Sequence, residues 1–352
     1  MNIASRGGGD PALVVTYSWI GDFVRSHTVV KLLRAQDPDR PVDMLASSLC
    51  APLADYMPGV RKAVVADFPH GRFSFSARRV LARRLREERY GQAIITLRTW
   101  KSALAPYLAG IPVRTGFLGE LRFGLINDIR SGEESLPRMI DHMGALALPR
   151  GAPLPAHWPE PELIVPERER VAWRQREGLI ERDTPVVALA PGAVGPGKAW
   201  PAAHYARLAQ DLSKDGVSIW VVGGPKESAA AALIAEAGGK SVRDLTGQDL
   251  CVAIRALAEA DVTVANDSGL MHVAAALGKP TVAIFGPSSV FHGAPLNPLA
   301  AVIEPPTPLD VLSRIKMEGT RAARHRNTAD VPLSEVSAAV RAALAKVLAN
   351  RG

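Results

Sequence analysis

The sequence predicts an α/β protein with two Rossmann-like domains, each built on a doubly wound parallel sheet. Apolar segments of strand length alternate with amphipathic helical segments, which is the order that produces parallel strands joined by helices. This alternation occurs twice, on either side of a stretch at residues 149–166 that contains six prolines. The chain has 352 residues, and a single hydrophobic core rarely serves more than about 250–300 residues.

The first half contains four apolar segments that we expect to be buried strands, each followed by a segment with helical spacing of its apolar residues. The expected strands are residues 12–17, 41–46, 60–66 and 92–97, and the expected helices are 22–36, 49–56, 74–89 and 101–109.

The same alternation resumes after the prolines. The expected strands are residues 185–190, 217–222, 242–245, 261–265 and 281–285, and the expected helices are 202–215, 226–237, 250–258, 270–277 and 334–348. Residues 304–332 are rich in proline and arginine and receive no assignment. We therefore expect a first domain at residues 1–150, an extended proline-rich linker at 151–183, a second domain at 184–330 and a closing helix within 331–352.

The net charge of +7 comes from 42 Lys and Arg against 35 Asp and Glu. Residues 1–150 hold 21 basic and 14 acidic side chains, a net charge of +7, and the remaining residues hold 21 of each. All of the excess therefore lies in the first half, which predicts a first domain that faces an anionic partner.

Several classes of protein are excluded by composition. No stretch approaches the apolar length of a membrane span, and the N-terminus lacks the layout of a signal peptide. The two cysteines, Cys50 and Cys251, cannot form a disulfide framework and lie in no Cys/His cluster of a zinc site. We expect buried thiols in a cytoplasmic protein.

In open parallel sheets, ligands bind outside the carboxyl ends of the strands, so the residues that follow each strand are the informative ones. The first strand is followed by Ser18-Trp19-Ile20-Gly21-Asp22. Asp22 lies at or next to a helix start. It could cap that helix, or act as a general base at the cleft between the domains, and the two roles are compatible.

The first strand of the second domain is followed by a loop that presents Gly192, Gly197 and Lys198 in the spacing of a phosphate-binding loop. Ala199 stands where such a loop needs Ser or Thr to hold magnesium, and the next helix begins only near Pro201. A nucleoside-triphosphatase loop is therefore disfavoured. Lys198 could still bind a phosphate, or could be a solvated lysine on a flexible loop.

Asn266-Asp267-Ser268-Gly269 follows a later strand and leads into an apolar helix that contains His272. Unpaired amides at a helix N-terminus form a natural anion site, and His272 lies about one turn further along. The alternative for His272 is a packed core histidine.

Two further segments follow strands of the second half. Glu227 stands at a helix start, where it could interact with the helix dipole or accept hydrogen bonds from ribose hydroxyls. Thr246 and Gly247 could border a nucleobase. In contrast, Asp37-Pro38-Asp39 has the spacing of metal-dependent sugar transferases, but its prolines and position predict a polar turn.

Together, these motifs resemble the ADP-heptose lipopolysaccharide heptosyltransferases of glycosyltransferase family 9, most closely the heptosyltransferase II group. The segments that carry the resemblance span nearly the whole chain: SWIGD (18–22), KSALAPYLAGIPVRTG (101–116), GELRFGLIND (119–128), GKAWP (197–201), NDSGLMHVAAAL (266–277) and GPSS (286–289). The resemblance implies a GT-B fold of two Rossmann-like domains facing across a cleft, with the C-terminal helix returning toward the first domain. It also implies inverting sugar transfer that needs no metal and no cofactor.

Carried over by position, the resemblance assigns Asp22 as the general base, Lys198 to the donor diphosphate and Glu227 to the donor ribose. Thr246 and Gly247 are expected near the adenine. The donor-phosphate segment comprises Asp267, Ser268, Gly269, Leu270, Met271 and His272. The acceptor candidates are the basic residues in or beside the matched segments of the first domain, namely Arg98, Lys101, Arg114 and Arg122.

The expected substrates are ADP-heptose, bound by the second domain, and a partly built lipopolysaccharide core, bound by the first. The Arg-rich segment 78–89 is most simply a solvated helix face, but it could also hold a cytoplasmic enzyme against the anionic inner face of the inner membrane. It lacks interleaved aromatic residues and matches no nucleic-acid motif, so nucleic acid is not an expected partner. The alternatives are a nucleotide-sugar transferase with a different sugar or acceptor and, less favoured, a P-loop-like nucleotide hydrolase or a protein that binds anions or nucleic acid.

Overall fold

The computed structural model describes residues 9–68, 73–179, 184–307 and 326–350. The chain divides into two compact units, Met1–Glu162 and Leu163–Gly352, and each contains a six-stranded sheet in which all paired strands are parallel. The boundary between the units therefore falls at Glu162, later in the chain than the expected division after residue 150.

The sheet of the first unit has the strand order β3-β2-β1-β4-β5-β6. Its strands are β1 (Ala12–Val15), β2 (Val42–Ala46), β3 (Val60–Val65), β4 (Gln92–Ile95), β5 (Val113–Phe117) and β6 (Asp128–Arg130). The last two were not expected from sequence, because their short segments VRTGF and DIR carry polar residues at half-buried positions.

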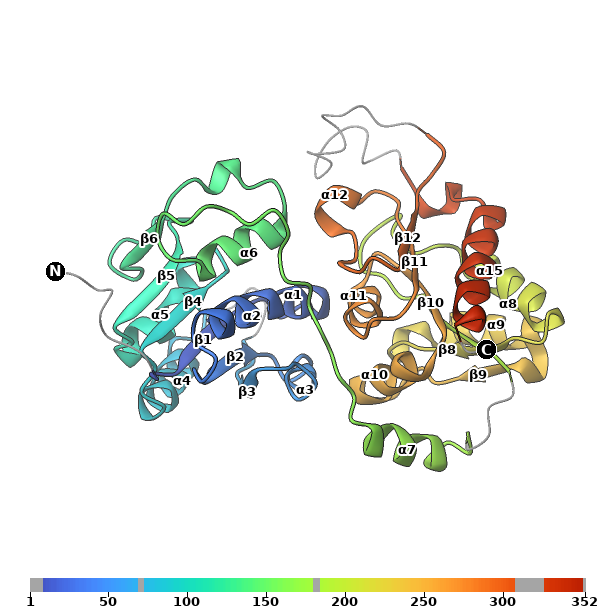
Figure 1. Cartoon of the computed structure of the whole chain (residues 1–352), viewed down its shortest axis with the longest axis horizontal. Coiled ribbons are helices and arrows are strands. Elements are labelled where there is room, and N and C mark those ends of the chain that lie inside the picture. The colour runs from blue at the N-terminus through green and yellow to red at the C-terminus, as the bar shows by residue number, and fades with distance from the viewer. Residues whose placement is uncertain (1–8, 69–72, 180–183, 308–325, 351–352) are drawn as a thin grey trace. The chain divides into compact units, whose positions relative to one another are not determined.

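Helices cover both faces of this sheet (Figure 1). They are α1 (Ile20–Arg25), α2 (His27–Gln36), α3 (Ala51–Ala54), α4 (Phe75–Glu87), α5 (Trp100–Ala109) and α6 (Met139–Ala147), with a 3₁₀ turn η2 (Glu133–Ser135). The expected helix at 22–36 is divided into two helices by a turn at Ser26, whose hydroxyl donates to the Phe23 carbonyl at 2.6 Å.

The sheet of the second unit repeats this topology, with the order β12-β11-β10-β7-β8-β9. Its strands are β7 (Val186–Ala190), β8 (Ser218–Val221), β9 (Val242–Asp244), β10 (Val262–Asn266), β11 (Thr281–Ile284) and β12 (Ala300–Ile303). Its helices are α7 (Glu167–Arg176), α8 (Ala202–Lys214), α9 (Ser228–Gly238), α10 (Leu250–Glu259), α11 (Gly269–Ala276), α12 (Val290–Gly293) and α15 (Leu333–Ala349), with 3₁₀ turns η3 (Pro225–Glu227), η4 (Gly239–Ser241) and η5 (Thr328–Asp330).

In each sheet the first strand of the unit is central: the next two strands of the chain lie on one side of it and the last three lie on the other side. The direction in which strands are added therefore reverses beside the first strand. The reversal lies between β1 and β4 in the first unit and between β7 and β10 in the second. Ligands of doubly wound sheets bind at the carboxyl ends of the strands at this point. The segments that contain Asp22, Lys198 and Asp267 follow β1, β7 and β10 and therefore lie at these two switch points.

The closing helix α15 belongs to the second unit. Its buried side chains, Val336, Val340 and Leu344, join the core formed by β7, β8, β10 and β11. The apolar face of the helix is thus used by its own unit.

Helix α7 lies inside the segment expected to be an extended linker. Its sequence is mostly charged and shows little amphipathic periodicity, which is why no helix was expected. Trp173 is buried against Trp220 with ring centroids 5.5 Å apart. Arg170 and Arg174 contact the buried Glu259 at 2.5 and 3.0 Å. Burial opposes the charge of Glu259, but the two guanidinium groups outweigh it and lower the pKa of this carboxyl.

The segment that ends the first unit is attached to the start of α2. The Thr28 hydroxyl donates to the Pro159 carbonyl at 2.7 Å, and the Glu162 amide donates to Nδ1 of the buried His27 at 3.0 Å. His27 Nε2 then donates to the Pro58 carbonyl at 2.8 Å. The next amide along the chain, that of Leu163, donates to Ala276 of the second unit at 2.8 Å. Consecutive residues are thus anchored to different units.

Candidate active site

Asn266, the last residue of β10, holds the loop that follows β7. Its side chain is fully buried, and its Oδ1 accepts hydrogen bonds from the Trp200 amide at 3.0 Å and the Tyr205 hydroxyl at 3.2 Å. Its Nδ2 donates to the Pro191 carbonyl at 2.7 Å. Both ends of the loop are therefore fixed to the strand that precedes Asp267. The sequence interpretation gave Asn266 no role, although a polar residue ending an otherwise apolar strand was the available signal.

This anchoring places Lys198 against Asp267, with Nζ 2.8 Å from Oδ2. Burial opposes ionisation of Asp267, but Lys198, the nearby Ser288 hydroxyl and His272 lower its pKa below the usual value. The two expected donor residues thus form a charged pair at the switch point. The Lys198 side chain keeps 32% of its surface exposed, so its ammonium can still reach a bound anion.

The first turn of α11 lies directly after this pair. Ser268 is in an extended conformation, and its side chain makes no capping hydrogen bond to the helix. The N-terminus of the helix thus offers backbone N–H groups that no side chain of Ser268 satisfies, together with the positive end of the helix dipole. Such an arrangement suits a phosphate group.

Two expected members of this segment point into the protein. The Met271 side chain is fully buried, and His272 is 5% exposed. Met271 can therefore contribute only its backbone to a ligand. His272 lies close enough to Asp267 to lower the pKa of that carboxyl. His272 is therefore a packed histidine, as the alternative interpretation expected, and it also acts electrostatically on Asp267.

A second set of contacts supports the loop from its other side. The Thr328 amide and hydroxyl donate to the Gly197 carbonyl at 3.0 and 3.1 Å. A Cβ at Gly286 would lie 2.7 Å from the Thr328 nitrogen and 2.8 Å from the Gly197 oxygen. The segment at 286–289 and the turn η5 therefore pack tightly against the loop. Thr328 lies in the region that received no assignment from sequence.

Glu227 ends the 3₁₀ turn after β8 and lies over the start of the β7 loop. A Cβ at Gly192 would be 2.8 Å from Glu227 Oε1, and a Cβ at Gly223 would be 3.0 Å from the Glu227 side chain. The Glu227 side chain therefore lies in space that a side chain at position 192 or 223 would fill. Next to it, the Gly247 amide donates to the Gly223 carbonyl at 3.1 Å. The Thr246 hydroxyl is bonded to Asp244 at 2.7 Å.

In the first unit, Asp22 lies in the first turn of α1 and makes no capping hydrogen bond, so the helix-cap alternative is wrong. Its Oδ1 is 2.6 Å from Nη2 of Arg25, and the two side chains are 17% and 13% exposed. The Tyr17 hydroxyl is close by: burial and the charge of Asp22 both raise its pKa. One carboxylate oxygen is thus held by Arg25.

The four acceptor candidates fall into two groups. Arg98 and Lys101 are exposed and follow β4, and Arg98 Nε lies 3.0 Å from Glu133. Arg122 is buried and donates to the carbonyls of Leu97 and Phe117. Arg114 lies near the amino-terminal end of β5 and donates to the Ile111 carbonyl at 2.5 Å and the Leu125 carbonyl at 2.7 Å. Arg114 and Arg122 therefore hold backbone, and neither is retained as an acceptor candidate.

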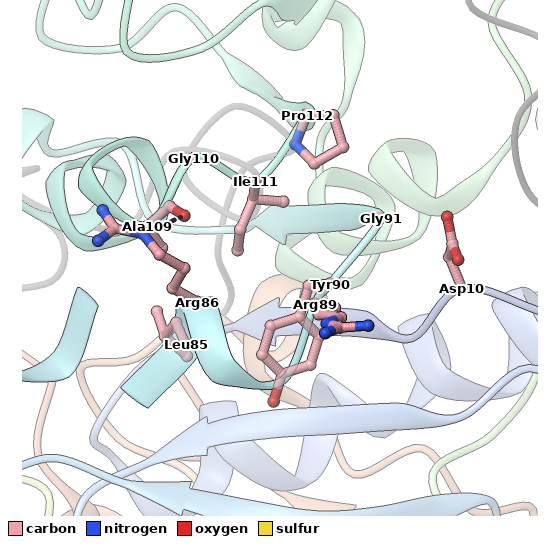
Figure 2. A pocket seen from close by; sticks show the side chains of 10 residues that line it. All are labelled: Asp10, Leu85, Arg86, Arg89, Tyr90, Gly91, Ala109, Gly110, Ile111 and Pro112. Atoms are coloured by element: carbon pink, nitrogen blue, oxygen red, sulfur yellow. Dashed lines mark hydrogen bonds between the residues drawn. The ribbon is translucent and has the colours of Figure 1, made fainter. Parts of the chain in front are cut away.

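A cavity of about 360 Å³ lies elsewhere in the first unit (Figure 2). Its lining residues precede the strands β1, β4 and β5 and include Asp10, Arg89, Gly91 and Pro112. It is therefore at the amino-terminal edge of the sheet, and no residue of the expected site lines it.

The motifs that point to metal chemistry give no site in the structure. Asp37 accepts from the Asp39 amide at 3.3 Å in a surface turn, as the sequence predicted. Helix α8 begins at Ala202, after Trp200 and Pro201, so the loop with Lys198 does not lead straight into a helix. Among the described residues there is no group of three acidic, His or Cys side chains able to hold a metal ion. Within the same ranges, no helix has the length and apolar character to span a membrane.

Comparison with known proteins identifies the family. The family model of glycosyltransferase family 9 (heptosyltransferase) matches residues 78–309. The chain belongs to this family. Its resemblance to the heptosyltransferases, and its character as a glycosyltransferase, are thereby confirmed.

Individual relatives agree with this assignment. The lipopolysaccharide heptosyltransferase 2 of Escherichia coli K12 is 38% identical over 305 residues, which cover 83% of this chain and 87% of that protein. The lipooligosaccharide heptosyltransferase 2 of Haemophilus influenzae is 34% identical over the same coverage.

Among solved structures, the ADP-heptose lipopolysaccharide heptosyltransferase II of E. coli matches with a TM-score of 0.79 at 34% identity, covering 97% of this chain and 100% of that one. A family 9 transferase from Veillonella parvula, at 19% identity and a TM-score of 0.79 over 96% of this chain and 98% of that one, shows the same fold. The predicted GT-B fold class is confirmed.

Proposed function

We propose that this family 9 transferase moves heptose from ADP-heptose to a heptose of the lipopolysaccharide inner core, with inversion at the anomeric carbon and without a metal ion. The names of the relatives supply the donor and acceptor classes. The observation that carries the mechanism is the Lys198–Asp267 pair beside the N-terminus of α11. In this proposal the pair supplies a cation, and the helix supplies backbone N–H groups, to the leaving diphosphate.

Donor recognition follows from the second unit. The amides of Ser268, Gly269 and Leu270 and the Lys198 ammonium bind the diphosphate. Glu227, over Gly192, accepts hydrogen bonds from the ribose hydroxyls. Thr246 and Gly247 border the adenine. Since Thr246 is already bonded to Asp244, its contribution is to shape the turn.

In the transfer step, an acceptor hydroxyl oxygen attacks the anomeric carbon while the bond from that carbon to the ADP oxygen breaks. The Asp22 carboxylate takes the proton of the attacking hydroxyl, and ADP leaves with the electron pair of the broken bond. The sugar passes through an oxocarbenium-like transition state. Lys198 and the α11 amides stabilise the negative charge that develops on the diphosphate. A single displacement inverts the anomeric configuration.

Acceptor binding falls to the first unit. Arg98 and Lys101 are exposed cations after β4, and the acceptor core is rich in carboxylates and phosphates. We further propose that the enzyme works in the cytoplasm, at the inner face of the inner membrane. The support is the +7 charge of residues 1–150 against none in the rest of the chain.

Incubation with ADP-heptose and a defined one-heptose acceptor tests the proposal. Mass spectrometry should show a gain of one heptose on the acceptor, and the anomeric coupling of the product should show inversion. The same reaction in EDTA should proceed at the same rate. If the acceptor gains mass only when another nucleotide sugar replaces ADP-heptose, the alternative of a transferase with a different sugar is favoured. Phosphate release from ATP with a magnesium requirement would favour a hydrolase.

A further inference from the structure

Three exposed aromatic side chains lie where α4 and α5 begin, and the Phe73 ring contacts the other two. Phe73, Phe75 and Trp100 are 44%, 47% and 36% exposed. The Phe73 ring centroid is 4.9 Å from that of Trp100 and 6.3 Å from that of Phe75. We call these three residues the aromatic cluster. Contiguous exposed apolar surface is uncommon on a soluble unit and marks a site of interaction.

Arg78 fixes this cluster from beneath. Its guanidinium lies 4.3 Å from the centroid of Phe68 and 5.1 Å from that of Phe73. It also donates to the Ser74 carbonyl at 3.1 Å and to the Lys101 carbonyl at 3.3 Å. The side chain is buried, and this burial lowers its pKa. Arg78 therefore joins the two helix starts and is not one of the surface charges that the sequence of 78–89 indicated.

The surface charge beside the cluster comes from other residues. Arg79, Arg83 and Lys101 are exposed, and the Arg79 guanidinium lies 6.0 Å from the centroid of Phe75. Val80, on the same helix, is 54% exposed. No Asp or Glu occurs from Phe75 to Arg86. Exposed aromatic rings and cations are thus adjacent, without a compensating acidic group on this stretch of helix.

We propose that the aromatic cluster, together with Arg79, Arg83 and Lys101, is a docking surface for an anionic lipid bilayer. Aromatic rings are favoured at the level of the headgroups, and each cation near an anionic leaflet adds electrostatic attraction. The cluster follows β3 and β4, at the same sheet edge that carries Arg98. The proposal deepens the proposed function, since an acceptor carried by lipid would be presented at this edge. It names the lipid surface as the partner.

Vesicle binding tests this proposal without any transfer reaction. The full chain is sedimented with vesicles of phosphatidylcholine alone or of phosphatidylcholine with phosphatidylglycerol. Binding should be at least about tenfold stronger to the anionic vesicles. The variant Phe73→Ser/Phe75→Ser/Trp100→Ser, and separately Arg79→Glu/Arg83→Glu, should each weaken it about tenfold or more. The control Phe291→Ser/Leu299→Ser changes residues of the second unit that are 42% and 55% exposed, and it should bind as the wild type does.

Thermal unfolding checks that each variant is folded. If the aromatic variant is unfolded, the charge-reversal variant alone still tests the proposal. Equal binding by wild type and both patch variants, or no preference for anionic vesicles, would overturn the proposal. Transfer to a water-soluble, delipidated acceptor is measured in parallel and should be unchanged in the aromatic variant. If the wild type transfers no heptose to this acceptor, the proposed function is contradicted. The vesicle-binding result does not depend on that outcome.

Discussion

Lys198 Nζ and Asp267 Oδ2 are 2.8 Å apart, joining the loop after β7 to the residue after β10. The lysine is thus positioned before any ligand arrives, so little reorganisation is needed when negative charge develops nearby. Preorganised charge of this kind is an effective way to stabilise a transition state.

Replacing Lys198 with Met should lower turnover by roughly 10²–10³, the usual cost of losing one group that stabilises developing charge. Lys198→Arg keeps a positive charge at this position, so its turnover should fall less than that of Lys198→Met. Steady-state kinetics with ADP-heptose measures both, and Lys226→Met, an exposed lysine of the same unit, is the control. Turnover of Lys198→Met within a factor of two of the wild type would exclude this role.

Asp22→Asn should lower turnover by about 10²–10⁴, the range for a general base, because the amide cannot accept the proton. Affinity for ADP, measured by calorimetry, should be unchanged, since the second unit binds the donor. The exposed Asp55→Asn serves as a matched control. If Asp22→Asn turns over as fast as Asp55→Asn, another group is the base.

Gly192→Ala tests the position of Glu227. The added methyl group would lie 2.8 Å from Glu227 Oε1, so the flexible carboxylate should move while the fold persists. Both Gly192→Ala and Glu227→Gln should weaken ADP binding, by about tenfold for one lost hydrogen bond to a charged group. In the double variant the losses should not add, because both changes remove the same contact. Additive losses would place Glu227 away from the ribose.

His27 should make the stability of the protein pH-dependent. Burial is the main cause that lowers its pKa from 6.5 to about 4. The unfolded chain therefore takes up a proton below pH 6.5, while the folded chain does not until about pH 4. This contribution to stability is complete above pH 6.5 and falls by about 3 kcal/mol as the pH drops to 4. Urea unfolding at pH 7 and pH 4.5 measures it, and His27→Gln should show a smaller decrease between the two.

Asn266→Ala should destabilise the second unit by about 2–4 kcal/mol, because it leaves the buried Trp200 amide and Pro191 carbonyl without their partner. Urea unfolding gives the change. Asn297→Ala, whose side chain also donates to two carbonyls but in a half-buried place, is the comparison and should cost less. Equal costs would mean that Asn266 does not anchor the loop.

Sequence reasoning was most reliable where a strand runs through the core. The apolar segments ending at Ala190 and Ala265 identified β7 and β10, and the residues that follow them contain the charged pair at the switch point. It failed where tertiary contacts decide the structure. Helix α7 depends on one buried tryptophan and on ion pairs to Glu259, which periodicity does not reveal.

The basic residues show the same limit. Arg114 and Arg122 carry the charge expected of acceptor contacts, but whether a guanidinium faces solvent or backbone carbonyls depends on the fold around it. Arg98 is exposed and Arg122 is buried, although the sequence predicted the same role for both. Thr328 lay beyond prediction for a related reason, since its partner Gly197 is distant in sequence.

The anchoring of Glu162 and Leu163 has a consequence for motion. The amide of Glu162 is held by His27 and that of Leu163 by the Ala276 carbonyl. The two amides lie on the peptide planes on either side of the Glu162 Cα, so rotation about φ and ψ of Glu162 leaves both hydrogen bonds intact. A change in the orientation of one sheet relative to the other is therefore expected to be taken up at these two backbone angles, and not spread along the proline-rich segment before them.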